Sequence, residues 1–462
     1  MENEWSNVTS SAGHLKVSRR AFLATPALAR SAPAQPAPRP NILLILADDL
    51  GYGDLGCYGQ KRIQTPHIDR LAASGIRFTQ AYAGSTVCAP SRCCLMTGLH
   101  TGHATVRGNK KPEVGLKPSE ITVASLLKQA GYRTALFGKW GLGGPGNGSV
   151  PTARGFDHFF GFYDQQHAHN SYPGHIWDGT VEKQLPENWF NRKKTFVPDL
   201  FAARAIEFLK APDPRPFFLY FATTIPHANN ELGAIQPNGM DSPDDGPYAS
   251  ENWPAVEKSF AATITRLDTQ VGQLVDTLKA QGLYENTLIL FSSDNGPHRE
   301  GNHDVNFFSS SGPLRGLKRD LYEGGIRVPM IATWKARIAP QQVIDTPWAF
   351  WDFLPTAAAL AGVNAPPNLD GVSIAPLLLG QGKPQRSHFY WEFHERGFQQ
   401  AVRRGDWKLV RQAPKFELEL FNLAEDVGET RNLAAQYPKI VAELEKLFRQ
   451  RTDSPDFPVR PA

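Results

Sequence analysis

The stretch Asn41-Ile42-Leu43-Leu44-Ile45-Leu46-Ala47-Asp48-Asp49 decides the fold class of this 462-residue chain. Its apolar residues follow one another without the alternation expected of a strand that has one face in water. A continuous run of this kind is typical of a strand buried on both faces. The two aspartates stand just past the carboxyl end of the strand, where parallel sheets carry their reactive groups. The stretch therefore predicts a central strand of an α/β sheet with a polar site beside it.

Further buried strands and helices alternate along the chain. We predict strands at 133–137, 217–222, 287–291 and 328–333, and helices at 121–130, 199–210 and 255–281. This alternation predicts an α/β fold with a large, mixed, mostly parallel sheet flanked by helices. Asp294 and Asn295 come soon after the strand at 287–291, so we expect them at the same edge of the sheet as Asp48 and Asp49.

The chain from residue 386 onward has a different pattern. Short segments at 388–393, 400–408 and 417–421 are divided by turns, and an amphipathic helix is predicted at 438–450. These segments predict a small C-terminal antiparallel sheet with a closing helix. We therefore expect a main, catalytic domain at 39–385 and a small C-terminal subdomain at 386–462.

Composition excludes several classes of protein. The chain is 41% hydrophobic and 20% charged, with a net charge of only +4 and no long basic block, so we expect no nucleic-acid partner. No apolar run is long enough for a membrane span. The four cysteines, Cys57, Cys88, Cys93 and Cys94, suit neither a disulfide framework nor a zinc site of paired cysteines.

The N-terminal residues 1–38 are predicted to be an export signal and a disordered linker. Residues 18–23 read Ser-Arg-Arg-Ala-Phe-Leu, which resembles a bacterial twin-arginine signal, and a proline-rich stretch covers 31–40. This indicates a periplasmic or secreted protein. The alternative is a disordered tail with a chance pair of arginines.

The run Cys88-Ala89-Pro90-Ser91-Arg92, followed by Thr97-Gly98, carries the chemistry. A lone cysteine is usually a small buried hydrophobic residue, but the Pro-Ser-Arg that follows does not fit that role. The run resembles the signature of type I sulfatases, the arylsulfatase-like members of the alkaline phosphatase superfamily. The resemblance implies that a formylglycine-generating enzyme converts Cys88 to formylglycine. The hydrated aldehyde would attack sulfur and later expel sulfate as the aldehyde re-forms.

Asp48, Asp49, Asp294 and Asn295 offer three carboxylates and an amide carbonyl. Such hard oxygen ligands suit Ca²⁺ or Mg²⁺. The resemblance implies Ca²⁺ held by these four residues, with an oxygen of the modified Cys88 or of the substrate sulfate completing the shell.

The resemblance also implies cations and an acid around the sulfate. Arg92 belongs to the first signature, Lys139 follows a predicted strand, and Lys318 lies in the run 315–329, which matches a second signature of the family. Arg315 and Arg319 are expected on the surface. His227, in an Ile-Pro-His sequence, would donate a proton to the departing alcohol.

One position departs from the family pattern. Many sulfatases have a histidine where this chain has Gly141, so another residue must act as the base that helps release sulfate. His167 and His169 are candidates, because histidines two apart on an extended segment face the same way; the alternative is a structural loop. His298, with Arg299, Glu300, His303 and Asp304, is expected to face the substrate, or else to form a solvated loop.

Together these features predict a sulfuric ester hydrolase that releases inorganic sulfate from a sulfated carbohydrate. A phosphate or phosphonate monoester hydrolase of the same superfamily is the alternative. Phosphatase relatives typically use zinc with histidine ligands and Ser or Thr as nucleophile, which the residues above do not match. A non-enzymatic carbohydrate-binding protein on the same scaffold would not need this set of nucleophile, ligands and cations.

Overall fold

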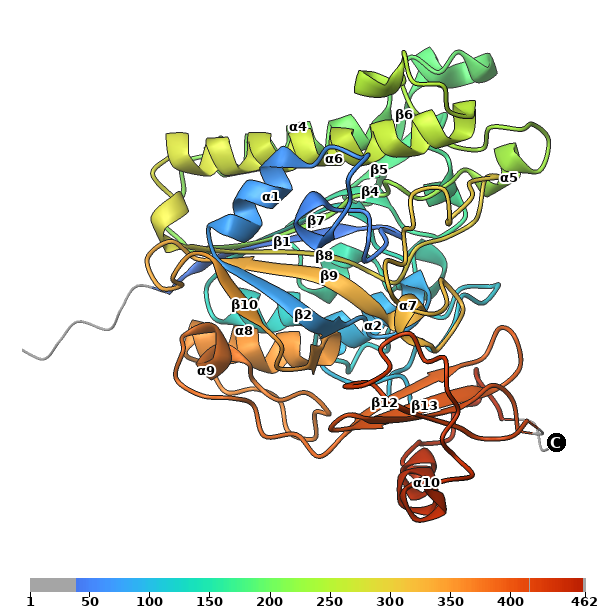
Figure 1. Ribbon diagram of the computed structural model, residues 1–462. Helices are drawn as coiled ribbons and strands as arrows, with labels where there is room; N and C mark the ends of the chain where they lie inside the picture. Colours follow the sequence, from blue (N-terminus) through green and yellow to red (C-terminus); the bar gives the residue numbers. More distant parts are fainter. Residues whose placement is uncertain (1–38, 415, 460–462) are drawn as a thin grey trace, which may run out of the picture. The chain divides into compact units, whose positions relative to one another are not determined.

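A computed structural model describes residues 39–414 and 416–459, and its main feature is an 11-stranded mixed sheet (Figure 1). The predicted export signal lies outside these residues. The strand order is β10-β2-β9-β8-β1-β7-β3-β4-β5-β6, with β11 beside β2. The strands are β1 (Asn41–Ala47), β2 (Ile76–Tyr82), β3 (Arg133–Lys139), β4 (His158–Phe162), β5 (His175–Asp178), β6 (Val181–Gln184), β7 (Phe217–Ala222), β8 (Thr287–Ser293), β9 (Arg327–Thr333), β10 (Gln342–Ile344) and β11 (Trp348–Ala349).

The central part of the sheet is parallel. Strand β1 pairs in parallel with β7 and β8, and β3 pairs in parallel with β7 and β4. Strand β9 runs antiparallel to both β2 and β8, which makes the sheet mixed. The predicted fold class is therefore confirmed, and β1 holds the central position expected from its sequence.

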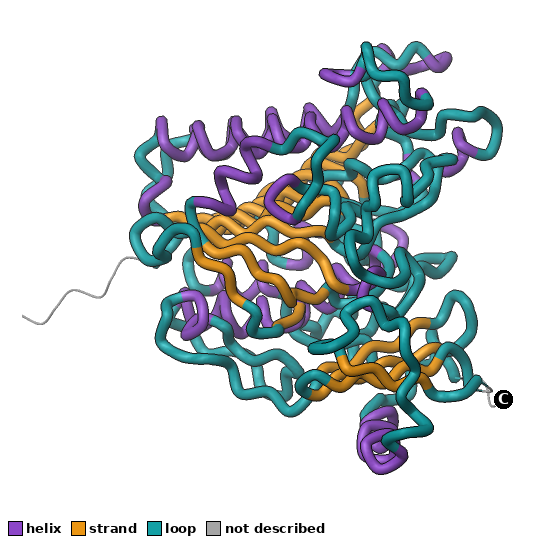
Figure 2. Tube along the Cα trace, viewed as in Figure 1, coloured by secondary structure: helices purple, strands orange, loops and turns teal. Residues whose placement is uncertain are grey.

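Helices cover both faces of this sheet (Figures 1 and 2). Leu43 and Ile45 pack into a core with α1 (Pro66–Ala73), α4 (Val197–Lys210) and α6 (Ala255–Ala280). Ile42, Leu44 and Leu46 pack into a second core with α2 (Cys88–Thr97), α3 (Val123–Gln129), α8 (Phe353–Ala361) and α9 (Ala375–Leu378). Burial on both faces explains why the run in β1 is continuously apolar.

The C-terminal part forms a separate four-stranded antiparallel sheet. Its strands, in spatial order, are β12 (Phe389–Phe393), β13 (Gln399–Arg404), β14 (Trp407–Arg411) and β15 (Glu419–Asn422). One face packs on α10 (Pro438–Glu445) and the 3-10 turn that follows it, as the predicted closing helix requires. The other face contributes Phe389 and Trp391 to the core beneath the large sheet.

Among the described residues, no helix has the length and apolar character needed to cross a bilayer. All four cysteines are free thiols. Two short helices, α5 (Asn230–Gly233) and α7 (Glu323–Ile326), belong to the long connections that follow β7 and β8.

Candidate active site

The ends of β1 and β8 bring the predicted carboxylates together. Ala47 pairs with Ser293 in the parallel register, so Asp48 and Asp294 follow neighbouring strand ends. The backbone amide of Asp49 donates to Asp294 Oδ1 over 3.1 Å. Asp49 has a φ of 66°, a left-handed conformation that costs a residue with a side chain free energy and that concentrates at functional sites.

Asn295 completes this group and has one unused oxygen. Its Nδ2 donates to Asp49 Oδ1 over 2.7 Å, whereas its Oδ1 is buried without a hydrogen-bond partner. The turn that carries Asn295 is held by glycines: a Cβ on Gly296 would lie 1.8 Å from the carbonyl oxygen of Gly324. The Gly-Gly pair of the second signature therefore lets two backbone segments meet beneath the site.

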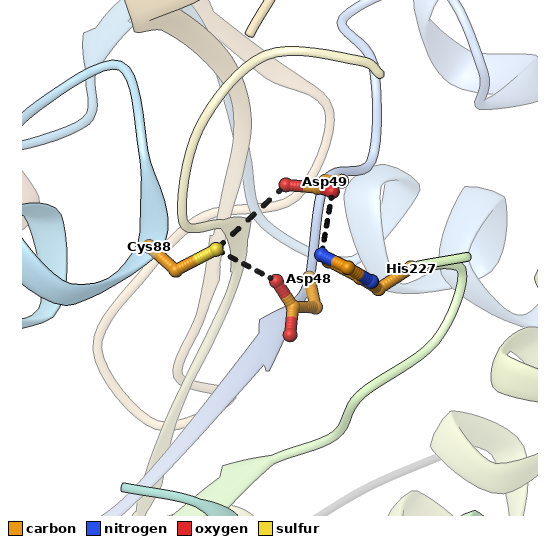
Figure 3. Close-up of side chains that lie close together, drawn as sticks. All are labelled: Asp48, Asp49, Cys88 and His227. Atoms are coloured by element: carbon orange, nitrogen blue, oxygen red, sulfur yellow. Dashed lines mark hydrogen bonds and ion pairs between the residues drawn. The ribbon is translucent and has the colours of Figure 1, made fainter. Parts of the chain in front are cut away.

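Cys88 is the first residue of α2 and points at the aspartates (Figure 3). Its Sγ lies 3.3 Å from Asp48 Oδ1 and 3.9 Å from Asp49 Oδ1. Burial, and then the charges of Asp294 and Asp48, raise the pKa of the thiol well above its ordinary value. The unmodified cysteine is therefore a neutral thiol here, which is a poor nucleophile.

Three buried cations surround the carboxylates. Arg92 donates to Asp294 Oδ2 from Nε and Nη2 over 3.0 and 2.8 Å. Lys139 Nζ lies 2.7 Å from Asp48 Oδ2, and Lys318 Nζ lies 2.7 Å from Asp49 Oδ2. The structure thus brings every residue of the predicted nucleophile, metal-ligand and cation sets into one cluster.

His227 faces the same cluster from the loop after β7, on the side of the aspartates opposite Cys88 (Figure 3). Its Nδ1 donates to the carbonyl of Ala228 over 2.6 Å, because a carbonyl can only accept. Its Nε2 lies 3.1 Å from Lys318 Nζ and 3.3 Å from Asp49 Oδ2. Burial, and then the charge of Lys318, lower the pKa of His227 to about 3, so the ring is neutral and its Nε2 accepts a hydrogen bond from Lys318 Nζ.

The candidate bases lie in different environments. His167 and His169 occupy a 3-10 helix rather than an extended segment, so the expectation that they face the same way is wrong. The ring of His169 stacks on His227 with 4.8 Å between centroids, whereas His167 packs against Phe162 and His175. A 3-10 helix turns about 120° per residue, which separates side chains two positions apart.

His298 has both ring nitrogens engaged by the backbone. Its Nδ1 accepts from the amide of Glu300, and its Nε2 donates to the carbonyl of Pro226. His298 therefore orders the loop instead of offering a free base. The expectation that His303 faces the substrate is wrong, because this ring is buried on Phe260 and bonds to Glu257.

The space beside Gly141 is filled by Gln165. Gly141 has a φ of 72°, and a Cβ built on it would lie 2.0 Å from Gln165 Nε2. A histidine at this position would therefore displace the glutamine. Gln165 lies just before the two candidate histidines in the chain, and its contact with Gly141 was not predicted.

Lys318 has further charged neighbours, of which Glu300 was expected near the substrate and Glu395 was not predicted. Glu300 Oε2 lies 2.8 Å from Lys318 Nζ, and Arg319 contacts both Glu300 and Glu395. These residues line a cavity of about 400 Å³. Arg319, expected on the surface, is partly exposed, at 26% of its side chain, and its ion pairs hold it in the cavity wall.

The donor set fits a hard divalent cation. Asp48, Asp49 and Asp294 supply buried carboxylates, and the unused Oδ1 of Asn295 is an oxygen with the character that Ca²⁺ or Mg²⁺ prefers. Burial, and then the charge of Asp48, raise the pKa of the Asp294 carboxyl to about 7. A cation bound beside Asp294 would therefore favour the ionised form of its carboxyl group.

Comparisons with known proteins agree with this geometry. A family model described as Sulfatase matches residues 40–363, and one described as N-sulphoglucosamine sulphohydrolase, C-terminal, matches residues 317–454. Arylsulfatase A of Homo sapiens is 35% identical, over 88% of this chain and 87% of that protein. An N-acetylgalactosamine-6-O-sulfatase of Bacteroides thetaiotaomicron is 30% identical, over 90% and 93%. The structure of Ps i-CgsB in complex with k-i-k-neocarrahexaose is similar with a TM-score of 0.73, at 28% identity over 89% and 92%.

Proposed function

The chain belongs to the sulfatase family and is a sulfuric ester hydrolase, and we propose that it releases sulfate from a sulfated carbohydrate through a formylglycine made from Cys88. The observation that carries the proposal is the position of Cys88 Sγ beside Asp48 and Asp49, in a cluster with three buried cations. Its thiol is held neutral, so oxidation to an aldehyde gives this position a reactivity that the cysteine lacks.

The reaction divides into two steps at residue 88. One hydroxyl of the hydrated aldehyde attacks sulfur, and the bond between sulfur and the sugar oxygen breaks. The remaining hydroxyl then loses its proton, the bond between the formylglycine carbon and the sulfate oxygen breaks, and the aldehyde re-forms. No second attack at sulfur is needed, which is the advantage of a diol over a serine.

Arg92, Lys139 and Lys318 bind and orient the sulfate in this proposal. Their charges also offset the negative charge that develops as the ester bond breaks. Asp48, Asp49, Asp294 and Asn295 would hold Ca²⁺, with Mg²⁺ as the alternative. When bound, the ion would lower the pKa of the attacking hydroxyl and neutralise sulfate charge.

In this proposal His227 Nε2 relays a proton to the departing sugar oxygen. Since Nε2 carries no proton in the resting arrangement, it first takes one from Lys318 Nζ, 3.1 Å away, and then passes it to that oxygen. An alkoxide is a poor leaving group, so this transfer is expected to contribute about 10²–10⁴-fold to the rate on sugar esters. His169, stacked on His227, is the candidate of the two histidines that lies close enough to take part in sulfate release.

The test compares sulfate and phosphate esters of 4-nitrophenol, and a set of sulfated saccharides, as substrates of protein co-produced with a formylglycine-generating enzyme. We expect release of inorganic sulfate, and loss of turnover by at least about a thousandfold in Cys88→Ala without loss of the folded state. Faster release of phosphate than of sulfate would favour the phosphate ester hydrolase instead. Full activity of Cys88→Ala would exclude covalent catalysis at this position.

We further propose a sulfated sugar as substrate because the B. thetaiotaomicron relative is named for N-acetylgalactosamine 6-sulfate. Residues 39–385 would form the catalytic domain and 386–462 the C-terminal subdomain. Export to the periplasm or beyond would follow from the twin-arginine-like segment at 18–23. N-terminal sequencing of the exported protein tests the last point, since an uncleaved cytoplasmic chain would contradict it.

A further inference from the structure

The cavity of about 400 Å³ beside Lys318 has an unusually charged lining. Its volume is in the range of about 300–1,000 Å³ that is common for small-molecule sites. Three arginines, two glutamates, Lys318 and His298 line it, and Leu317 is the single apolar side chain in the lining. Such walls do not suit an apolar leaving group, and they favour a ligand with charges and hydroxyls.

The two carboxylates in this lining already have partners. Glu300 pairs with Lys318 over 2.8 Å and with Arg319 over 2.5 Å. Glu395 pairs with Arg319 over 3.3 Å and accepts the backbone amide of Asn109 over 2.8 Å. Arg319 therefore has a carboxylate on each side. Both carboxylates already have partners, so neither is free to pair with Arg299 or Arg396.

Two guanidinium groups of the lining pair with neither of these glutamates. Within residues 39–414 and 416–459, the side chain of Arg299 has no ion-pair or hydrogen-bond partner. Arg396 makes a long ion pair with Asp320, at 3.7 Å, and 44% of its side chain is exposed, so its other N–H groups can reach a ligand. Arginine presents paired N–H donors that match the oxygens of a carboxylate or sulfate.

The position of the cavity identifies the part of the substrate that would occupy it. Lys318 belongs both to the cavity lining and to the sulfate cluster, and Glu300 Oε2 lies 3.5 Å from His227 Nε2. If His227 protonates the departing oxygen, the sugar must lie on this side of the sulfate. Arg396 and Glu395 come from the connection between β12 and β13, so the small sheet contributes to the same wall.

We infer that this cavity binds a second anionic group of the saccharide, a carboxylate or a further sulfate, through Arg299 and Arg396. The inference rests on the proposed function and narrows its substrate class to acidic saccharides. Arg299 and Arg396 are thus specificity-determining residues, distinct from the cations that bind the reacting sulfate.

The experiment uses full-length protein that carries the modified residue 88. Substrates are sulfated, uronate-containing disaccharides from lyase digestion of chondroitin and heparan sulfates. One arm compares each disaccharide with its carboxyl-reduced form, and the other compares disulfated with monosulfated forms. The measured quantity is the ratio of kcat/KM with the second anion to kcat/KM without it. Variants are Arg299→Gln, Arg396→Gln and, as a control, Arg337→Gln on an exposed turn.

We expect a ratio of about ten or more in at least one arm, as for a charge-assisted hydrogen bond. The arm that responds identifies carboxylate or sulfate as the group bound. The ratio should fall toward one in Arg299→Gln and Arg396→Gln, and keep its wild-type value in Arg337→Gln.

Two results would overturn the inference while the proposed function stands. These are a wild-type ratio near one during normal sulfate release, and a ratio that neither Arg299→Gln nor Arg396→Gln lowers. Failure to release sulfate from any saccharide or from 4-nitrophenyl sulfate would instead remove the proposed function, and the inference with it.

Discussion

At the scale of single residues, His227 and Lys318 form a pair whose role depends on the leaving group. His227→Ala should lower kcat/KM on a sugar sulfate by about 10²–10⁴-fold, because the departing alkoxide then lacks a proton donor. The loss on 4-nitrophenyl sulfate should be much smaller, since a phenolate leaves with little protonation. His167→Ala is the matched control, because that ring faces Phe162 and His175. Equal losses of His227→Ala on both substrates would contradict the assignment.

Asn295 tests the metal site through an oxygen that has no other partner: its Oδ1 makes no hydrogen bond, whereas Asn295→Ala also removes the bond from Nδ2 to Asp49. Chelation of the wild type should lower the melting temperature and abolish activity, and added Ca²⁺ should restore both. At a Ca²⁺ concentration of 100 times Kd the ion adds about 2.7 kcal/mol to stability. Asn295→Ala should weaken Ca²⁺ binding in calorimetry about tenfold or more, while the exposed Asn306→Ala should not. Unchanged binding in Asn295→Ala would exclude this oxygen as a ligand.

At the scale of elements, the turn after β3 contains Gly141, where many sulfatases have a histidine, and Gln165 fills the space beside it. Gly141→Ala should destabilise the protein by about 1–3 kcal/mol, through its left-handed φ and through contact with Gln165. Gly131→Ala measures the backbone cost alone, since Gly131 also has a positive φ but no atom within 4 Å of a Cβ. Urea unfolding should be measured for Gly141→Ala, Gln165→Ala and the double variant. The double variant should lose about 0.5–3 kcal/mol less stability than the sum of the two single losses. Additive effects would mean that Gln165 does not limit this position.

The elements also show which parts of the fold the sequence can predict. Strands β1, β7 and β8 were predictable because burial on both faces leaves a continuous apolar run, and Asp48 and Asp294 follow from their positions at strand ends. Strand β2 was missed because Arg77, Thr79 and Gln80 interrupt its apolar pattern. Gln80 accepts from Arg403 of the small sheet, a partner that lies far along the chain and leaves no local pattern.

The same limit applies to the site. Motifs identified Cys88, Lys139, His227 and Lys318, but the wall of the charged cavity arises only when the β12–β13 connection meets the loop after β8. The sequence around Glu395 and Arg396 is typical of an exposed turn, and only tertiary contacts bring these residues beside Lys318. The 3-10 helix at His167–His169 was likewise not predictable, because it lies within a loop that has no periodic sequence pattern.

At the scale of the whole molecule, a buried ion cluster joins the two sheets. Lys408 of β14 lies 2.9 Å from Glu323 of α7 and 2.9 Å from Glu429, with both lysine and glutamate side chains fully buried. Lys408→Met should destabilise the protein by about 3–5 kcal/mol in urea unfolding, because the buried Glu429 loses the cation beside it and Glu323 loses one of its two, keeping Arg327. Lys335→Met, at an exposed turn, should stay within about 0.5 kcal/mol of the wild type. Comparable stability of the two variants would show that the cluster does not link the sheets energetically.

The central claim for the molecule is that residue 88 acts as an aldehyde in a site built for sulfate. The most direct measurement is the mass of the peptide spanning residue 88, taken from active protein with and without an aldehyde-reactive hydrazine. The account predicts a peptide that has lost hydrogen sulfide and gained one oxygen relative to cysteine, that forms a hydrazone, and whose fraction rises in proportion to specific activity. Fully active protein with an unmodified Cys88 thiol would contradict it.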